Sequence, residues 1–356
     1  MNKAQLQKVL FNMELRGLNQ LLVCSPMNIY YLTGRRIHPG ERLAALVISR
    51  DGSVDFIANR LFAQAPLEGA RLVEYSDTDD SAEVLSHSVK DGVLGVDKEF
   101  SCRFALPLME KRPSLRLTLG SDCIDGARML KTEAEIAVMR ESSRLNDEAL
   151  SRTIAKLKPG MTENDVANLY RAAIKEVGGT GESFESLICF GAGCAEPHHE
   201  TGDAVLREGD SVILDVGLLY GSYCSDMTRT VFAGEPTEEQ KKVYELVLRA
   251  NEAGKAAVRP GVPLREVDAA ARSVIEKAGY GEYFIHRTGH GIGLEVHEFP
   301  DASAVSEAVC TPGMVFSVEP GIYLPGRFGV RIEDLVAVTE DGCECLNHLP
   351  RELKSI

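Results

Sequence analysis

Three of the eight histidines of this chain lie within the thirteen residues HRTGHGIGLEVHE, at positions 286–298. His286, His290 and His297 are interspersed there with three glycines, and a glutamate ends the segment. Imidazole nitrogens bind metals and transfer protons near neutral pH. A helical His-x-x-x-His zinc site is one interpretation, but the glutamate of the HExxH motif is missing and the glycines disfavour a helix. We therefore expect an extended segment, bent at its glycines, in which one histidine binds a metal while others face a substrate.

Two aspartates lie in the segment SVILDVGLLYGSYCSDMTRTVFAG, residues 211–234. Its two apolar strands flank a turn that we predict at Tyr220 and Gly221. A two-residue loop at that point places Asp215 directly opposite Asp226, with Cβ atoms roughly 4.5–5.5 Å apart. Facing carboxylates destabilise a sheet unless a cation lies between them. The alternative is a loop of different length with both aspartates pointing into water.

The same pattern occurs again in residues 314–339, where MVFSVEPGIYL and FGVRIEDLVAVT flank a predicted three-residue loop at 325–327. This loop pairs Glu319 with Glu333, provided that Pro320 occupies a position needing no hydrogen-bond donor. Two facing carboxylate pairs in apolar strands favour a metal site over coincidence. Four carboxylates neutralise two divalent cations, which in two-metal sites lie about 3.5–4 Å apart.

Helices and strands with regular patterns surround these residues. The second part of the chain contains four predicted helices, and Thr132 with Glu135 forms a capping box at the start of the first. Thr162 is the expected N-cap of the second. These helices cover residues 131–160, 161–179, 237–258 and 264–278. Strands lie between and after the helices, so we predict an α+β domain.

The first part of the chain alternates strands with helices and contains no reactive constellation. Strands are predicted in LNQLLVC at 18–24 and DGVLGVD at 91–97, and a hairpin is predicted around Arg50, Asp51 and Gly52. The first seventeen residues have the pattern of an amphipathic helix without a signal-peptide core. We therefore expect two domains, a smaller α/β domain over 1–125 and a catalytic domain over 126–356.

The composition limits the functional classes. The chain is 44% hydrophobic and 26% charged, as in soluble globular proteins. Its net charge of −14 disfavours a nucleic-acid partner, and no apolar run is long enough for a membrane span. Nine scattered cysteines without an export signal favour reduced thiols and a cytoplasmic location. The CEC segment at 343–345 is a poor metal site by itself, and a phosphate-binding GxxxxGK loop is absent.

The motifs LDVG…SDMTRT, GHGIGLEVHE, VEPGIY and RIED, in this order, resemble the C-terminal domain of the M24 metallopeptidases, which include methionine aminopeptidase, aminopeptidase P and prolidase. The resemblance covers about residues 130–350 and implies a pita-bread fold, preceded by an N-terminal domain similar to that of prolidase and aminopeptidase P. It places the five metal ligands of the family on Asp215, Asp226, His290, Glu319 and Glu333. Each position holds a ligand residue, which disfavours a metal-free or binding-only relative.

Further residues match the substrate side of the family's site. AEPHHETGD, residues 195–203, resembles the segment that precedes the first aspartate strand, so His198 is the candidate there. Prolidases commonly have glycine where this chain has His199, which leaves the choice between these two histidines open. His286 and His297 match the pair that flanks the ligand histidine, and Arg331 matches an arginine of the proline-specific members.

The resemblance implies hydrolysis of the bond before proline, in dipeptides or at peptide N-termini, by a hydroxide that bridges two metal ions. In that mechanism His297 is expected to stabilise the oxyanion, and Glu319 is the candidate to carry the proton to the leaving nitrogen. Oxygen-rich ligands with one imidazole favour Mn²⁺, with Co²⁺, Zn²⁺ or Fe²⁺ as alternatives. A homodimer is expected. The alternative functions are an M24 aminopeptidase of other specificity, such as N-terminal methionine removal, and a non-catalytic peptide-binding relative.

Overall fold

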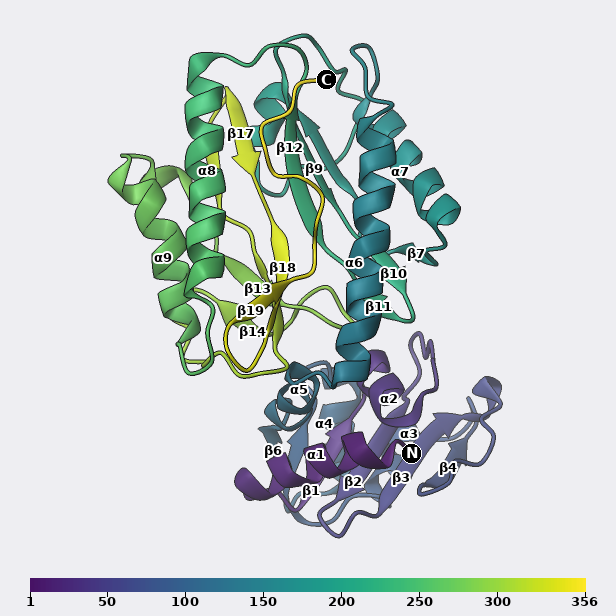
Figure 1. The fold of residues 1–356 in the computed structure, drawn as a ribbon. Coiled ribbons are helices and arrows are strands. Elements are labelled where there is room, and N and C mark those ends of the chain that lie inside the picture. Colours follow the sequence, from purple (N-terminus) through teal and green to yellow (C-terminus); the bar gives the residue numbers. More distant parts are fainter. The chain divides into compact units, whose positions relative to one another are not determined.

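The computed structural model describes residues 1–356, which form two compact units, Met1–Arg128 and Met129–Ile356 (Figure 1). Each unit has its own sheets and its own clusters of buried apolar side chains. The α/β pattern expected for the first part of the chain and the α+β pattern expected for the second are both observed.

The first unit is built on one six-stranded mixed sheet with the strand order β4-β3-β2-β1-β5-β6. The strands expected near residues 18–24 and 91–97 and the hairpin around Asp51 are confirmed. The elements are α1 (Lys3–Leu15), β1 (Gln20–Val23), α2 (Pro26–Thr33), β2 (Ala45–Ser49), β3 (Val54–Asn59), the 3₁₀ turn η1 (Arg60–Phe62), β4 (Arg71–Tyr75), α3 (Ser81–Ser86), β5 (Gly92–Val96), α4 (Cys102–Lys111), β6 (Leu115–Leu119) and α5 (Asp122–Met129).

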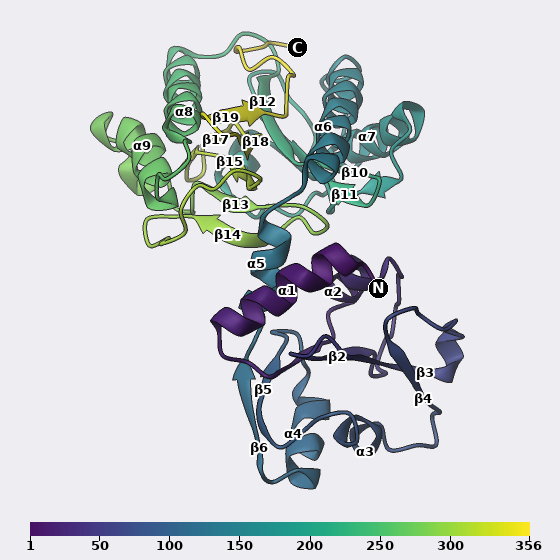
Figure 2. The same ribbon diagram turned by 60° about the horizontal axis from the view of Figure 1, so that its bottom comes forward.

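Four long helices dominate the second unit, as the sequence predicts. The expected capping box is present: the Thr132 side chain accepts from the Glu135 backbone at 3.3 Å, and the Glu135 carboxylate accepts from the Thr132 backbone at 2.7 Å. Thr162 caps the second helix in the same way. The helices are α6 (Glu133–Ile154), α7 (Glu163–Val177), α8 (Glu238–Ala257) and α9 (Leu264–Lys277). Helices α6 and α7 pack side by side, as do α8 and α9 (Figures 1 and 2).

Mostly antiparallel strands lie between the two helix pairs (Figure 1). They form sheets with the orders β12-β9-β8, β14-β13-β15-β18-β19, β16-β17 and β11-β10-β7. The remaining elements are β7 (Gly181–Glu182), β8 (Leu187–Phe190), η2 (Gly191–Ala195), β9 (Ser211–Val216), β10 (Leu218–Tyr220), β11 (Tyr223–Cys224), β12 (Met227–Phe232), η3 (Gly281–Tyr283), β13 (Gly289–Gly291), β14 (Glu298–Ala302), β15 (Val315–Val318), β16 (Gly321–Leu324), β17 (Phe328–Arg331), β18 (Asp334–Val338) and β19 (Cys343–Cys345).

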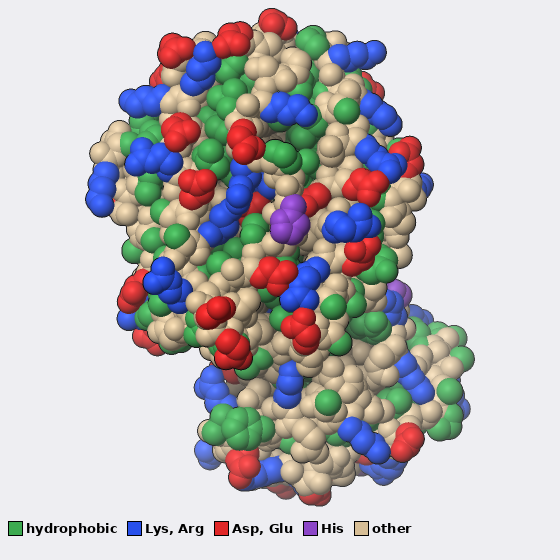
Figure 3. Space-filling view, in the orientation of Figure 1, with side chains coloured by type: hydrophobic (Ala, Val, Ile, Leu, Met, Phe, Trp, Pro, Cys, Tyr) green, Lys and Arg blue, Asp and Glu red, His purple; other side chains and the backbone are tan.

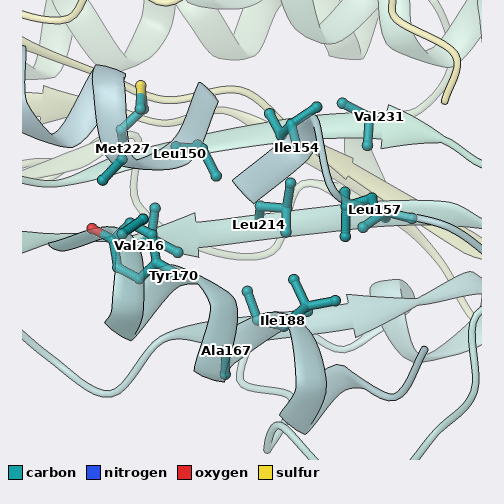
Figure 4. Close-up of a cluster of buried hydrophobic side chains, with 14 of the residues drawn as sticks. Leu150, Ile154, Leu157, Ala167, Tyr170, Ile188, Leu214, Val216, Met227 and Val231 are labelled. Atoms are coloured by element: carbon teal, nitrogen blue, oxygen red, sulfur yellow. The ribbon is translucent and has the colours of Figure 1, made fainter. Parts of the chain in front are cut away.

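One apolar core joins helices α6 and α7 to strands β8, β9 and β12 (Figure 4). A polar contact inside it fixes how these elements meet. The buried Tyr170 hydroxyl on α7 donates to Asn146 Oδ1 on α6 at 2.6 Å, and the Asn146 amide donates to the Val216 carbonyl on β9 at 3.0 Å. The end of β9, close to Asp215, is thereby held against both helices.

The surface visible in Figure 3 carries acidic and basic side chains in a mixed pattern, with hydrophobic side chains in small groups. None of the helices combines the length and the apolar character that a bilayer span requires. All nine cysteines are free thiols, and five of them are buried.

Replacing Tyr170 with Phe should lower the free energy of unfolding by about 1–3 kcal/mol, because Asn146 Oδ1 then stays buried without a partner. The matched control is Tyr220→Phe, whose side chain is 37% exposed, and a change within about 0.5 kcal/mol is expected there. Urea-induced unfolding of both variants measures the difference. Equal losses would show that the buried hydrogen bond does not hold α7 to α6.

Candidate metal centre

The first hairpin differs from the prediction in its turn. Asp215 on β9 lies opposite Thr228, and Met227 lies opposite Val216, so Asp226 precedes β12 and does not face Asp215 directly. The predicted direct pairing was wrong because the turn is at Gly221 and Ser222, one residue later than expected. Both turn residues have positive φ, +55° and +74°, as a type I′ turn requires.

The two aspartates still reach the same cavity. Moving the turn by one residue slips the pairing by two residues, and side chains along a strand alternate with a period of two. A slip of two therefore keeps both side chains on one face of the hairpin. Asp215 and Asp226 both line one cavity of the second unit, which has a volume of about 490 Å³.

The second hairpin has the predicted register. Val318 lies opposite Asp334 in the β15–β18 pair, and Gly321 lies opposite Arg331 in the β16–β17 pair. Glu319 and Glu333 therefore occupy matching positions between these two strand pairs. Pro320 lies in the same gap, where its carbonyl accepts from the Ile332 backbone at 3.4 Å and no donor is required of it. The register prediction for this hairpin is confirmed.

Backbone hydrogen bonds join this hairpin to its neighbours at the glutamates themselves. The Glu319 backbone donates to the Thr288 carbonyl at 2.8 Å, and the Glu333 backbone donates to the Thr228 carbonyl at 3.1 Å. The Thr228 hydroxyl also donates to Glu333 Oε2 at 2.7 Å. Three separate segments are thus held together around the acidic side chains.

His290 lies on β13, in the extended conformation expected from its glycines. A Cβ on Gly289 would lie 1.8 Å from the Ser317 carbonyl oxygen, so only glycine permits this approach of β13 to β15. The Gly291 carbonyl oxygen forms a hydrogen bond with His290 Nδ1 at 3.1 Å. His290 Nε2 lies 3.4 Å from Glu319 Oε1 and 3.7 Å from Asp226 Oδ2. The imidazole therefore presents one nitrogen to the carboxylates, as metal-binding histidines do.

The five expected metal ligands and four expected substrate-side residues line this one cavity. They are Asp215, Asp226, His290, Glu319, Glu333, His198, His286, His297 and Arg331.

Three carboxylate oxygens in the cavity are buried without any hydrogen-bond partner: Asp215 Oδ1, Asp226 Oδ1 and Glu333 Oε1. Buried polar atoms without partners are rare and costly in folded proteins. Ligand atoms of Asp226, His290 and Glu333 also lie within 4.8 Å of one another. Carboxylate oxygens with one imidazole are a donor set for divalent cations. The residues present thus fit the divalent metal ions implied by the family resemblance.

The electrostatics of the cavity agree with this fit. Burial, followed by repulsion from the other carboxylates, raises the pKa of Asp226 and of Glu333. Burial likewise raises the pKa of Glu319 to about 7. Burial also lowers the pKa of His290 to about 3, so this imidazole is neutral and able to act as a ligand at neutral pH. A bound cation would compensate the charge that the acidic groups concentrate here.

Arg331 is the buried cation among these acids. Its Nη2 donates to Asp215 Oδ2 at 2.6 Å, its Nη1 donates to the Tyr323 hydroxyl at 3.0 Å, and its Nε donates to the Thr228 hydroxyl at 3.1 Å. Burial opposes its charge, but Tyr323 and Asp215 outweigh that effect and raise the pKa of Arg331. Its geometry therefore orients one carboxylate as well as placing a positive charge on the cavity wall.

The other histidines occupy distinct surroundings. His286 is held by the Arg287 carbonyl at 2.7 Å and by the Tyr323 hydroxyl at 2.8 Å, and burial lowers its pKa to about 4. The ring of His297 meets that of His290 edge to face, with centroids 4.2 Å apart. His198 is exposed and lines the cavity, whereas His199 contacts Glu163 at 2.9 Å and does not line it.

Sequence reasoning did not identify several contributors to this site. Tyr323 links His286 to Arg331, and Arg287 lines the cavity while its Nη1 pairs with Asp301 at 2.6 Å. The buried ion pair between Lys131 and Glu298, at 3.2 Å, holds the loop that carries His297. Arg287 lies between His286 and His290 in the sequence, and this position was a signal that it lines the cavity. Lys131 is 167 residues from its partner, and no local pattern points to it.

Known proteins are similar to this chain over both units. Residues 137–340 match metallopeptidase family M24, and residues 5–130 match the creatinase/prolidase N-terminal domain. An uncharacterised peptidase of Staphylococcus aureus is 36% identical over 335 residues, which cover 92% of this chain and 93% of that protein. This chain therefore belongs to metallopeptidase family M24.

Solved structures extend the similarity to nearly the whole chain. The prolidase of Thermococcus sibiricus is 37% identical, with a TM-score of 0.94 over 100% of this chain and 99% of that one. A dipeptidase of Pyrococcus horikoshii OT3 is 36% identical, with a TM-score of 0.93 over 99% of this chain and 100% of that one. An Xaa-Pro dipeptidase of Bacillus anthracis is 31% identical, with a TM-score of 0.90 over 99% of both chains. The expected pita-bread fold with its preceding domain is confirmed, and the chain is a peptidase.

Removing the metal should destabilise the protein more at about pH 8 than at about pH 5. In the metal-free chain the pKa of Glu319 rises from an ordinary 4.5 to about 7, so between these values the folded state binds more protons than the unfolded state. The free energy of unfolding of the metal-free protein must then fall as the pH rises from about 4.5 to about 7. Calorimetric Tm values with and without EDTA, at verified metal content, measure the difference. An EDTA effect of equal size at both pH values would contradict an uncompensated acidic cluster.

Proposed function

We propose that this protein hydrolyses the peptide bond before proline, in dipeptides or at peptide N-termini, with two divalent metal ions. The observation that carries the proposal is the set of three buried carboxylate oxygens without partners, from Asp215, Asp226 and Glu333, beside His290. A protein retains such a set when a ligand compensates it, because an unpaired buried charge is strongly destabilising.

Asp215, Asp226, His290, Glu319 and Glu333 would hold the two ions, and Mn²⁺ is the ion we favour for this oxygen-rich set. Bound ions of this kind would lower the pKa of a water toward neutrality and neutralise charge that develops on the substrate carbonyl. The buried Glu319 carboxylate is proposed to take up a proton and pass it to the leaving proline nitrogen.

The histidines are proposed to act on the substrate. Burial lowers the pKa of His297, so its imidazole is neutral and donates one N–H, which suits stabilisation of the oxyanion. His198, which also lines the cavity, is proposed as a catalytic group. His286 and Arg331, joined through the Tyr323 hydroxyl, form a fixed wall against which a proline ring would pack.

Proline specificity is supported by the solved relatives, which are described as a prolidase and as an Xaa-Pro dipeptidase. We further propose a homodimer, on the family resemblance, and a cytoplasmic location, because all nine cysteines are free thiols.

The substrate preference is tested with Ala-Pro, Ala-Pro-Ala, Met-Ala-Ser and Ala-Ala-Ala, each with added Mn²⁺. We expect hydrolysis of one or both proline peptides and at least about tenfold lower kcat/KM for the two others, since the pocket must accept a tertiary amide. Preferential cleavage of Met-Ala-Ser would instead assign removal of N-terminal methionine. Absence of all hydrolysis at full metal occupancy would favour a peptide-binding role.

The three histidines of residues 286–298 should differ in the property that each one controls. His290→Ala should lose bound metal first, because its nitrogen faces Asp226 and Glu319. His297→Ala should keep its metal and lose kcat by roughly 10²–10³, the cost of one oxyanion donor. His286→Ala should keep its metal and raise KM. Metal analysis and steady-state kinetics of the three variants decide this, and loss of metal in all three would contradict the division of roles.

A further inference from the structure

His199 stands beside the cavity residue His198 but faces away from the cavity. Its Nε2 donates to Glu163 Oε2 at 2.9 Å, and its side chain is 17% exposed. Its ring packs on Gly193, where a Cβ would lie 3.1 Å from the imidazole. Neighbouring histidines therefore lie in different surroundings, one open to the cavity and one enclosed by protein.

Glu163 is a buried carboxylate, 1% exposed, at the first residue of α7. Besides the imidazole, its Oε2 accepts from the Gly202 backbone at 2.8 Å and its Oε1 accepts from the Phe190 backbone at 3.2 Å. Its partners come from the end of β8 and from two points of the loop that follows η2. Its ion-pair partner is the His199 imidazole, and its other contacts are with backbone N–H groups.

The loop between these contacts carries residues of the cavity wall. Pro197 and His198 line the cavity and are followed at once by His199. A second anchor lies just beyond, where the Thr201 hydroxyl accepts from the Ile188 backbone at 2.9 Å and donates to the Ser186 carbonyl at 2.8 Å. With Thr201 held by β8 and His199 held by α7, little freedom remains for the backbone at His198.

We infer that Glu163 and His199 form a positioning pair that sets His198 against the substrate. Neither Glu163 nor His199 lines the cavity, so the pair acts through the backbone of residues 197–199. The inference rests on the role proposed for His198. It gives a function to the histidine that stands where prolidases commonly have glycine, because a glycine there could not reach Glu163.

The variant His199→Phe keeps a ring against Gly193 and removes the donor to Glu163. We expect kcat/KM for the best proline peptide to fall about tenfold, mainly through kcat, with bound metal unchanged, since a misplaced catalytic group slows the reaction without weakening the metal site. His199→Gln retains a side-chain N–H and should recover a large part of the loss. The matched control is His87→Phe, which removes the exposed pair of His87 with Glu83 on α3 and should leave the kinetics unchanged.

The same substitution in a His198→Ala background tests whether the effect passes through His198. We expect no further loss there, because the group that the pair positions is already gone. An equal tenfold loss in both backgrounds, or no loss in the native background, would overturn the inference.

Hydrogen exchange of residues 196–202 gives a readout independent of catalysis. Exchange in this segment should be faster in His199→Phe than in the native protein, because the loop has lost its contact between His199 and Glu163. Exchange should be unaltered in His87→Phe. Unchanged exchange would overturn the inference even if activity fell. If His198→Ala were fully active, the role proposed for His198 would fail, while the exchange result would still decide whether the pair holds the loop.

Discussion

Repulsion among buried carboxylates is the constraint on which the organisation of the second unit depends. Asp215, Asp226, Glu319 and Glu333 converge on one cavity, and three of them each have an oxygen without a hydrogen-bond partner. Arg331 pairs with one of these acids and leaves the others uncompensated. Because the burial of like charges is costly, the surrounding fold must be rigid enough to hold them in place.

That rigidity comes from the way the hairpins are joined. Asp226, Glu319 and Glu333 each lie in a short gap between two consecutive strands. At such interruptions the backbone turns its polar groups toward other segments. The backbone of Glu319 bonds to Thr288, and that of Glu333 bonds to Thr228. The irregular positions are therefore the points at which the hairpins and the His290 strand are fastened together.

A further group of buried charged side chains lies next to the cavity acids. Asp334, next to Glu333 and fully buried, pairs with Arg229, Lys255 and Arg351. Arg229 also donates to the Glu333 carbonyl at 2.6 Å. Here a buried acid is compensated by protein cations, whereas the acids of the cavity are not. The contrast indicates that the cavity acids are arranged for an external cation rather than for stability.

Local patterns in the sequence determined the helices, most strands and the glutamate hairpin. The capping residues Thr132 and Thr162 mark helix starts through hydrogen bonds three residues away, and the loop at 325–327 sets the register of Glu319 with Glu333. The turn of the first hairpin was misplaced by one residue, because Ser222 adopts a positive φ that residue type does not signal.

Only the tertiary structure decided which side chains meet. It separated His198 from His199, since the partner of His199 is Glu163, 36 residues earlier in the chain. It also brought Lys131 to Glu298 and Arg331 to Asp215, across 167 and 116 residues. Hydrogen bonds within a turn or helix are fixed by neighbouring residue types, and so the sequence alone determined them. Contacts between distant segments depend on how whole helices and sheets pack, and no short stretch of this chain contains that information.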